Sequence, residues 1–295
     1  MSAEPGEPAR PTRLGWGDLA QLHALSRTLA WDHTQDDWAS FLKCGLIYGL
    51  RRDGGDEPGA PIDACAAVFP YGPHTAVIGM AMVAPDRQRR GLGRAVVARC
   101  LQGKPDDTAV YLAATREGLG LYERLGFRHV GGLRKFMHQG GLAEEADAAA
   151  EIRDQIAIAH LAPVLRLDRT AFGAPRDAFL KARLSQAATR AAAVDAEGNV
   201  VGYGLGVDQG DLRILGPIAA ADDAVAAALA ARLARDWRGR LRIDLPDHRD
   251  GLSKRLEALG FIQVDAPPIL ARDGAAYPGE AGWRDYAAIS CQACL

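Results

Sequence analysis

The fold of this chain is decided by one stretch, Val83-Ala84-Pro85-Asp86-Arg87-Gln88-Arg89-Arg90-Gly91-Leu92-Gly93-Arg94. An apolar run, Thr75 to Val83, precedes it, and a run of helical periodicity, Ala95 to Leu101, follows it. This pattern predicts a strand that leads through a glycine-containing loop into the start of a helix. Backbone N–H groups of such a loop converge with the unpaired N–H groups of the helix start and carry positive potential. We therefore expect a loop that binds a diphosphate.

The residues of the loop suit an anion. Gly91 and Gly93 let the backbone approach a diphosphate closely and take positive φ at little cost. Three arginines add cationic donors, namely Arg89, Arg90 and Arg94. Two common nucleotide loops are excluded, because Val96 stands where the dinucleotide fingerprint needs a third glycine and no Gly-Lys-Ser/Thr sequence occurs in the chain.

A second motif follows the loop. Ala109 to Ala114 has the composition of a buried strand, and Leu119, Tyr122 and Leu125 recur every three residues, as on a helix that Gly126 ends. The sequence Gln88-x-x-Gly91-x-Gly93 resembles the coenzyme A pyrophosphate loop of the GNAT acetyltransferase superfamily. The sequence Leu121-Tyr122-x-x-Leu125-Gly126-Phe127 resembles the Leu-Tyr-x-x-Leu-Gly-Phe segment of the same superfamily. The order strand, loop, helix, strand, helix, strand also matches its core.

Length and composition bound the class of protein. At roughly 150 residues per domain, 295 residues suggest about two domains. A net charge of −2 gives no broad basic field, so we expect no nucleic-acid partner. No apolar run approaches the ~18 residues of a membrane span, and we expect no membrane association. Met1 to Arg13 is polar and proline-rich, which predicts a frayed tail. Five scattered cysteines argue against a disulfide framework and predict a cytoplasmic protein.

The second half of the chain repeats the pattern of the first. Strand-like runs at Leu212–Ile218 and Leu241–Leu245 enclose an alanine-rich helix, and the triplets at Leu125 and Leu259 lie 134 residues apart. Gln139 to Ala146 is the best linker candidate. We therefore predict a GNAT domain over residues 13–138 and a degenerate GNAT-like domain over residues 150–295. In the second copy, Pro217 and two carboxylates, Asp222 and Asp223, replace the amides and arginines of the loop, so only the first domain should bind coenzyme A.

The second half also resembles the C-terminal domain of a bacterial two-domain GNAT subgroup. The residues that carry this resemblance are Asp168-x-x-x-Ala171-Phe172-Gly173-x-x-Arg176, Gly198 to Tyr203, Gly216 to Ala219 and Ile243 to Pro246. The subgroup's first half carries Leu-x-Ala-Thr-x-x-Gly-x-x-Leu-Tyr, which stands here as Leu112 to Tyr122. The resemblance implies a mixed α/β fold of two tandem domains, each a twisted, mainly antiparallel sheet flanked by helices.

The resemblance also assigns residues to acetyl transfer. Backbone amides near Met82 and Val83 would hold pantetheine and polarise the thioester carbonyl. The amides of Gln88, Arg89, Arg90, Gly91, Leu92, Gly93 and Arg94 would take the pyrophosphate. Thr115, which replaces an asparagine common in the family, is also expected to bind the cofactor. Tyr122 matches the tyrosine that protonates the departing thiolate. The unperturbed pKa values, about 10 for tyrosine and about 8.5 for a thiol, make that transfer uphill but feasible in direct contact. A core role for a tyrosine on an apolar stripe is the alternative.

The general base and the acceptor site are less defined. Many family members place a glutamate on the strand before the tyrosine's helix, where this chain has Val110. The segment Trp31-Asp32-His33-Thr34-Gln35-Asp36-Asp37-Trp38 could bind a cationic amine, with His33 as a candidate base. Its alternative is a capped helix start with Trp38 in the core. Asp244 is a second acceptor-site candidate.

These observations predict an enzyme, an N-acetyltransferase. It would move an acetyl group from acetyl-CoA directly to a primary amine of a small cationic acceptor. The alternative is a non-catalytic acyl-CoA sensor or regulatory module, which the missing strand carboxylate and the degenerate second half favour. The histidines have no metal-ligand spacing, so we expect no metal. The sequence predicts neither the identity of the acceptor nor the oligomeric state.

Overall fold

The computed structural model describes residues 10–52, 57–142, 150–272 and 283–295. Its chain divides into two compact units. The first unit comprises Met1–Phe69 and Ile78–Lys104, and the second comprises Pro70–Val77 and Pro105–Leu295. None of the described helices is both long enough and apolar enough to cross a bilayer. The mixed α/β class predicted from the sequence is confirmed.

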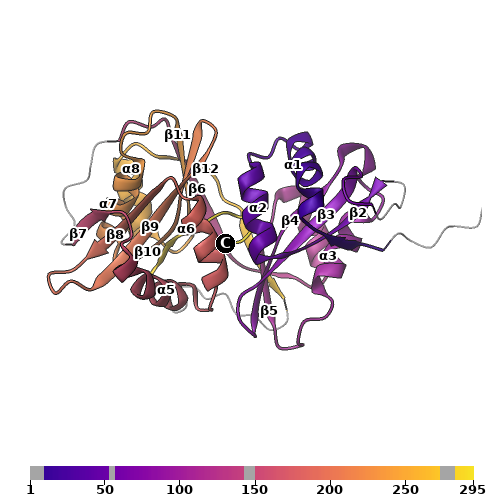
Figure 1. Cartoon of the computed structure of the whole chain (residues 1–295), viewed down its shortest axis with the longest axis horizontal. Helices are drawn as coiled ribbons and strands as arrows, with labels where there is room; N and C mark the ends of the chain where they lie inside the picture. Colours follow the sequence, from indigo (N-terminus) through magenta and orange to yellow (C-terminus); the bar gives the residue numbers. More distant parts are fainter. Residues whose placement is uncertain (1–9, 53–56, 143–149, 273–282) are drawn as a thin grey trace, which may run out of the picture. The chain divides into compact units, whose positions relative to one another are not determined.

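The first unit is a sheet with helices on both faces. Its strands are β1 (Thr12–Leu14), β2 (Leu46–Arg51), β3 (Ile62–Pro70) and, from Ile78 onward, β4 (Thr75–Val83). Its α-helices are α1 (Leu19–Thr28), α2 (Gln35–Cys44) and α3 (Leu92–Leu101) (Figure 1). The strands lie in the order β1-β2-β3-β4, with β1 and β3 antiparallel to β2. The prediction of a frayed tail was wrong for Thr12 and Arg13, because these residues pair with Gly49 and Tyr48 of β2.

The two faces of this sheet are covered by different helices. Phe41 of α2 packs edge-on against Phe69 of β3, with ring centroids 5.6 Å apart. Tyr48 lies opposite Ala66, three positions from Phe69, so its side chain projects to the other face. There the guanidinium of Arg99, on α3, lies 4.3 Å from the centre of the Tyr48 ring. Helix α3, which carries the predicted loop at its start, is thereby fixed to the sheet.

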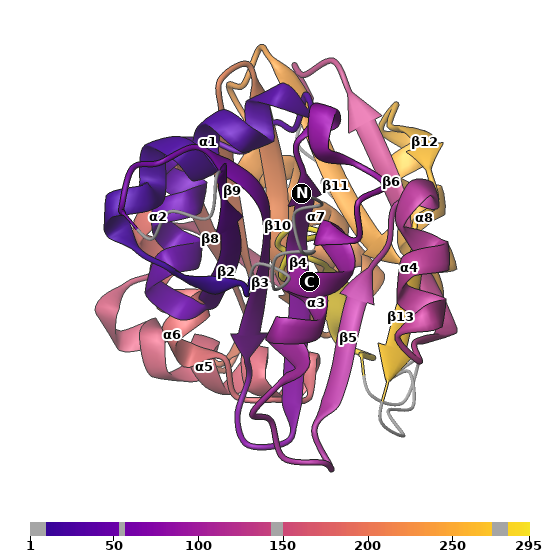
Figure 2. The same cartoon turned by 90° about the vertical axis from the view of Figure 1, so that its right-hand side faces the viewer.

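The second unit is a larger sheet in the order β5-β13-β6-β11-β10-β9-β8-β7 (Figures 1 and 2). Neighbouring strands are antiparallel except β10 and β11. Residues Thr75–Val77 of β4 pair in parallel with Ala109–Tyr111 of β5. The strands are β5 (Ala109–Ala113), β6 (Arg128–His138), β7 (Glu151–Asp154), β8 (Thr189–Val194), β9 (Val200–Gln209), β10 (Leu212–Ala220), β11 (Arg240–Pro246), β12 (Ile262–Asp265), β13 (Pro268–Arg272) and β14 (Tyr286–Ala288).

Helices flank this sheet too. They are α4 (Leu119–Arg124), α5 (Ile158–Phe172), α6 (Asp177–Gln186), α7 (Asp223–Ala234) and α8 (Asp250–Ala258). Two glycines, two positions apart on β9, make room for α7. A Cβ on Gly202 would lie 3.0 Å from Leu229 Cδ1, and a Cβ on Gly204 would lie 2.8 Å from Leu233 Cδ1. The alanine-rich helix predicted from the sequence is therefore a helix that packs closely on a glycine-rich strand.

The two halves of the sequence exchange strands within the second unit. Strand β13, from the second half, lies between β5 and β6 of the first half, with Ile269 opposite both Ala113 and Gly131 (Figure 2). Strand β6 in turn pairs along β11 and β12 of the second half. The predicted domain boundary, between residues 138 and 150, was placed from the sequence repeat. The two compact units divide the chain at other positions, after Phe69, Val77 and Lys104. Of the predicted linker, residues 139–142 lie outside any helix or strand and residues 143–146 lie outside the described residues.

Candidate active site

Strand β4 contains a residue of unusual backbone conformation before it reaches the loop. Met80 is buried and has φ +51°, a left-handed conformation that is rare for residues other than glycine. A left-handed residue inside a strand is typical of a β-bulge, which turns the amides that follow it out of the regular ladder. Those amides belong to the segment that holds Met82 and Val83. Sequence reasoning missed Met80, although Gly79 beside it was a usable signal, since an isolated glycine in a strand often marks a bulge.

The predicted loop has the geometry of an anion cradle. A short 3-10 helix, Pro85–Arg87, leads to Gln88, and the chain then takes positive φ at Arg89 (+61°) and Gly91 (+79°). The first backbone hydrogen bond of α3 runs from the Ala95 N–H to the Gly91 carbonyl, 3.1 Å. The N–H groups of Leu92, Gly93 and Arg94 therefore leave the helix end with no acceptor inside the helix.

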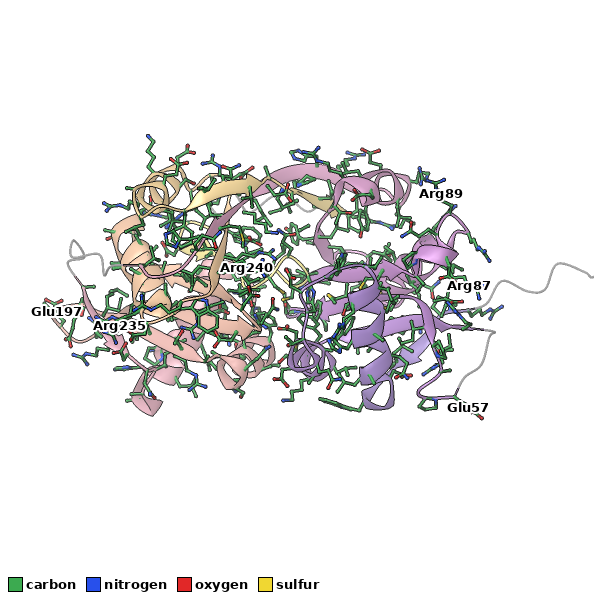
Figure 3. All side chains as sticks on the ribbon, turned by 90° about the horizontal axis from the view of Figure 1, so that it is seen from above. Glu57, Arg87, Arg89, Glu197, Arg235 and Arg240 are labelled. Carbon is green, nitrogen blue, oxygen red and sulfur yellow. The ribbon has the colours of Figure 1, made fainter. Side chains whose placement is uncertain are left out.

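The charges around the loop divide into two groups. Arg87 lies beside Asp63 and Asp86, with N–O distances of 3.5 and 3.6 Å, so its charge is compensated. Arg89 and Arg94 are exposed and form no ion pair within the part of the chain that the structure describes. Figure 3 shows the side chains of Arg87 and Arg89 extending outward from the ribbon of the first unit. The loop thus offers amides and at least two uncompensated cations to an anion.

Tyr122 lies on α4 in the second unit, where its ring is largely buried. Its relative exposure is 8%, and its ring meets Phe127 edge-on at 5.9 Å. A Cβ on Gly118 would lie 2.9 Å from Tyr122 Cε2, so the ring needs a glycine at that position. Thr115 precedes the 3-10 turn Arg116–Gly118, and its carbonyl accepts the Gly118 N–H at 3.1 Å. These contacts explain the Thr-x-x-Gly-x-x-Leu-Tyr spacing, because the threonine closes the turn before the helix and the glycine leaves room for the tyrosine ring.

The first acceptor-site candidate contains a helix cap. The Asp37 N–H donates to Thr34 Oγ1 at 3.1 Å, and the Thr34 N–H donates to Asp37 Oδ2 at 2.9 Å. This capping box uses the Asp37 carboxylate, and Trp38 is fully buried in the core. Asp32 is exposed, and the Trp31 and His33 rings lie 5.8 Å apart. Of the three carboxylates in this segment, Asp32 and Asp36 remain exposed to a cationic ligand, whereas Asp37 is buried.

Asp244, the second acceptor-site candidate, is buried within the second unit. Arg242 on the same strand donates to both of its carboxylate oxygens, at 3.0 and 2.5 Å. Gln292 Nε2 donates a further hydrogen bond at 3.2 Å. Its charge is thus compensated by Arg242 of its own strand, and the C-terminal segment adds a neutral hydrogen-bond donor. Among the described residues no three His, Cys, Asp or Glu side chains gather as a metal-ligand set.

Comparisons with known proteins agree with this architecture. Two models of the acetyltransferase (GNAT) domain match the chain, one over residues 46–129 and the other over residues 164–282. YitH of Bacillus subtilis (strain 168), described as an uncharacterised N-acetyltransferase, is 33% identical over 242 residues, which span 81% of this chain and 82% of that relative. The chain belongs to the GNAT acetyltransferase family. It is therefore an acyltransferase built from two GNAT domains in tandem.

Solved structures share the fold of this GNAT protein. A putative acetyltransferase from Pyrococcus horikoshii matches with a TM-score of 0.77 at 16% identity, over 100% of this chain and 99% of that one. A tandem GNAT protein from the clavulanic acid biosynthesis pathway matches with a TM-score of 0.67 at 15% identity, over 91% of this chain and 99% of that one. At these identities the likeness shows the fold and not the substrate.

Proposed function

We propose that this protein transfers an acetyl group from acetyl-CoA to a primary amine of a small cationic acceptor. The observation that carries the proposal is the loop after β4, where three amides of the α3 start and left-handed Gly91 converge beside uncompensated arginines. A diphosphate is the anion that such a helix start favours, and acetyl-CoA is the carrier that the GNAT family uses.

The residues divide the chemistry among them. Gln88 to Arg94 bind the pyrophosphate, and the amides around Met82 and Val83, which follow the left-handed Met80, polarise the thioester carbonyl as negative charge develops on its oxygen. The amine attacks that carbon, the carbon–sulfur bond breaks, and Tyr122 supplies the proton that the thiolate takes. Thr115 fixes the turn that positions Tyr122.

The acceptor amine must lose a proton, and β5 supplies no carboxylate for this step. Val110, at the position of the family glutamate, is fully buried, and no other residue of β5 carries a carboxylate. We assign binding of the cationic acceptor to Trp31, Asp32 and His33, with His33 as the candidate base. Asp244 is the weaker candidate, because Arg242 already neutralises it.

Release of free thiol from acetyl-CoA, measured against a panel of polyamines, amino acids, aminoglycosides and lysine peptides, tests this function. We expect saturable turnover with one class of amine. For Tyr122→Phe we expect kcat to fall by about 10²–10⁴-fold, with the KM for acetyl-CoA nearly kept, as is typical for loss of a general acid. Tyr48→Phe is the matched control, because its ring stays under Arg99. Slow hydrolysis without any preferred amine would instead favour an acyl-CoA sensor.

A further inference from the structure

The last described segment of the second unit, Trp283–Leu295, is almost entirely buried. Ten of its thirteen residues are buried, and Tyr286, Cys294 and Leu295 are completely so. The family model of the second half ends at residue 282, before this segment begins. A buried segment that lies outside the matched domain needs a physical reason for its position.

The segment enters the opening between β10 and β11. These parallel neighbours pair only over Leu212–Ile214 and Arg240–Arg242. Beyond that ladder, β14 pairs antiparallel with β10, with Ala288 opposite Ile218 and Tyr286 opposite Ala219. On the other side, the Ile289 N–H donates to the Asp244 carbonyl of β11 at 2.9 Å. The main chain of the segment is therefore hydrogen-bonded to both strands and fills the gap that they leave.

The segment is held there by residues of the motifs that the second half shares with the two-domain GNAT subgroup. Arg176 forms a buried two-point ion pair with Asp168, at 3.0 and 2.8 Å, and its Nη1 donates to the Leu295 carbonyl at 2.9 Å. Tyr203 donates its hydroxyl to the same Asp168 carboxylate. A Cβ built on Gly216 would overlap the Ile289 carbonyl oxygen. The motifs quoted for the second half thus converge on one task, which is to seat the C-terminal segment.

Further bonds fix both ends of the segment. Trp283 Nε1 donates to the Phe172 carbonyl at 2.9 Å, and the Tyr71 hydroxyl donates to the Cys294 carbonyl at 3.0 Å. The start of α7, the counterpart of the phosphate-binding helix start, is also occupied. Asp222 accepts the Val225 N–H at 2.8 Å, and Asp223 forms an ion pair with Arg249 at 2.7 Å.

We propose that residues 283–295 are a built-in occupant of the groove between β10 and β11, which closes the second GNAT domain to acyl carriers. Its backbone pairs with β10, the counterpart of β4 in the second copy, and it is to amides of β4 that we assign the pantetheine of acetyl-CoA. That comparison rests on the proposed function, whereas the occupancy of the groove does not. The second domain thus has the fold of a domain that binds an acyl carrier, but its groove is filled by residues 283–295 of its own chain.

Labelling of the two cysteines in the segment tests the proposal. N-ethylmaleimide is added to the folded full-length chain, and peptide mass spectrometry follows each cysteine. We expect Cys291 and Cys294 to react at least 100-fold more slowly than in urea, and saturating acetyl-CoA to leave both rates unchanged. Reaction as fast as in urea would show that the segment is not seated. Acceleration by acetyl-CoA would show that a carrier displaces it, and either result overturns the proposal.

Two variants and a control make the test specific. Gly216→Ala forces the Ile289 carbonyl away, so we expect Cys291 and Cys294 to react at least 10-fold faster. Tyr71→Phe removes only the hydroxyl that holds Cys294, and we expect a smaller acceleration at Cys294 with the urea midpoint nearly kept. The control is Gly15→Ala, because a Cβ there meets no atom within 4 Å. Unchanged rates in both variants would refute the seating, whether or not the first domain binds acetyl-CoA.

Discussion

His138 is held as a neutral imidazole at the end of β6. Its Nδ1 accepts the Gly140 N–H at 2.8 Å, and its ring lies 5.1 Å from the Phe261 ring. Nδ1 can accept only when it carries no proton, so the proton of the neutral ring is assigned to Nε2. Burial lowers the pKa of His138 below its ordinary value of 6.5, because desolvation disfavours the charged form.

The lowered pKa of His138 predicts a loss of stability in mild acid. The unfolded chain binds this proton first, so the contribution of His138 is complete above about pH 6.5 and is lost as the pH falls from there through the lower pKa of the folded state. In urea unfolding from pH 8 to 5, we expect wild type to lose more stability than His138→Asn, whose side-chain oxygen can still accept from Gly140. Parallel pH profiles for the two proteins would contradict this role for His138.

At the residue scale, the sequence correctly predicts a backbone conformation where glycine is the residue type that the conformation favours. Gly126 was predicted to end a helix, and it has φ +86° directly after Leu125, the C-cap residue of α4. Gly260, the equivalent residue of the second copy, has φ +90°. Met80 and Arg89 also have positive φ, but neither type signals it, because tertiary structure and not intrinsic preference imposes the conformation there.

At the scale of elements, the strand–loop–helix unit was predictable because its signals are local. The strand predicted over Thr75 to Val83 is observed with the same bounds, and the helix begins at Leu92, directly after Gly91. Apolar runs set the strand, and the glycine conformation sets the helix start. The neighbours of each strand in the sheet were not predictable. Alternation of apolar and polar side chains identifies a strand, but it does not specify which other strand will pair with it.

The loop predicts a charge-specific loss of coenzyme A binding. Gly91→Asp adds strain at φ +79° and places a carboxylate beside the proposed diphosphate, so we expect the Kd for acetyl-CoA to rise more than 10-fold in calorimetry. Gly103→Asp is the matched control. Gly103 lies beyond the other end of α3 at φ +75°, and a Cβ there also meets nothing within 4 Å. Equal losses of affinity for acetyl-CoA in both variants would show that the diphosphate does not lie beside Gly91.

At the scale of the whole molecule, the repeat was visible in the sequence but the strand exchange was not. Strand β13 is only five residues long, and it lies between β5 and β6 rather than among strands of its own half. Nothing in Pro268–Arg272 distinguishes the two destinations, because either edge would bury the same apolar side chains. The deciding factor is the set of long-range contacts, which local patterns do not encode.

The exchange predicts that the halves of the chain do not fold separately. A fragment of residues 1–142 lacks β13, which leaves the facing edges of β5 and β6 without a hydrogen-bonding partner. A fragment of residues 150–295 lacks β6, the partner of β11 and β12. We expect each fragment to aggregate or unfold without cooperativity, and co-expression to restore a folded complex. Cooperative urea unfolding of the first fragment alone would contradict this expectation.

The placement of β13 also has a consequence for biosynthesis. Ala113 finds its neighbour Ile269 only after the ribosome has added more than 150 further residues. At roughly 5–20 residues per second, nascent β5 waits on the order of 10–30 s for the strand that completes its sheet. During that interval its open edge is exposed to other chains, so successful production depends on how quickly translation finishes and on chaperones that shield the edge meanwhile.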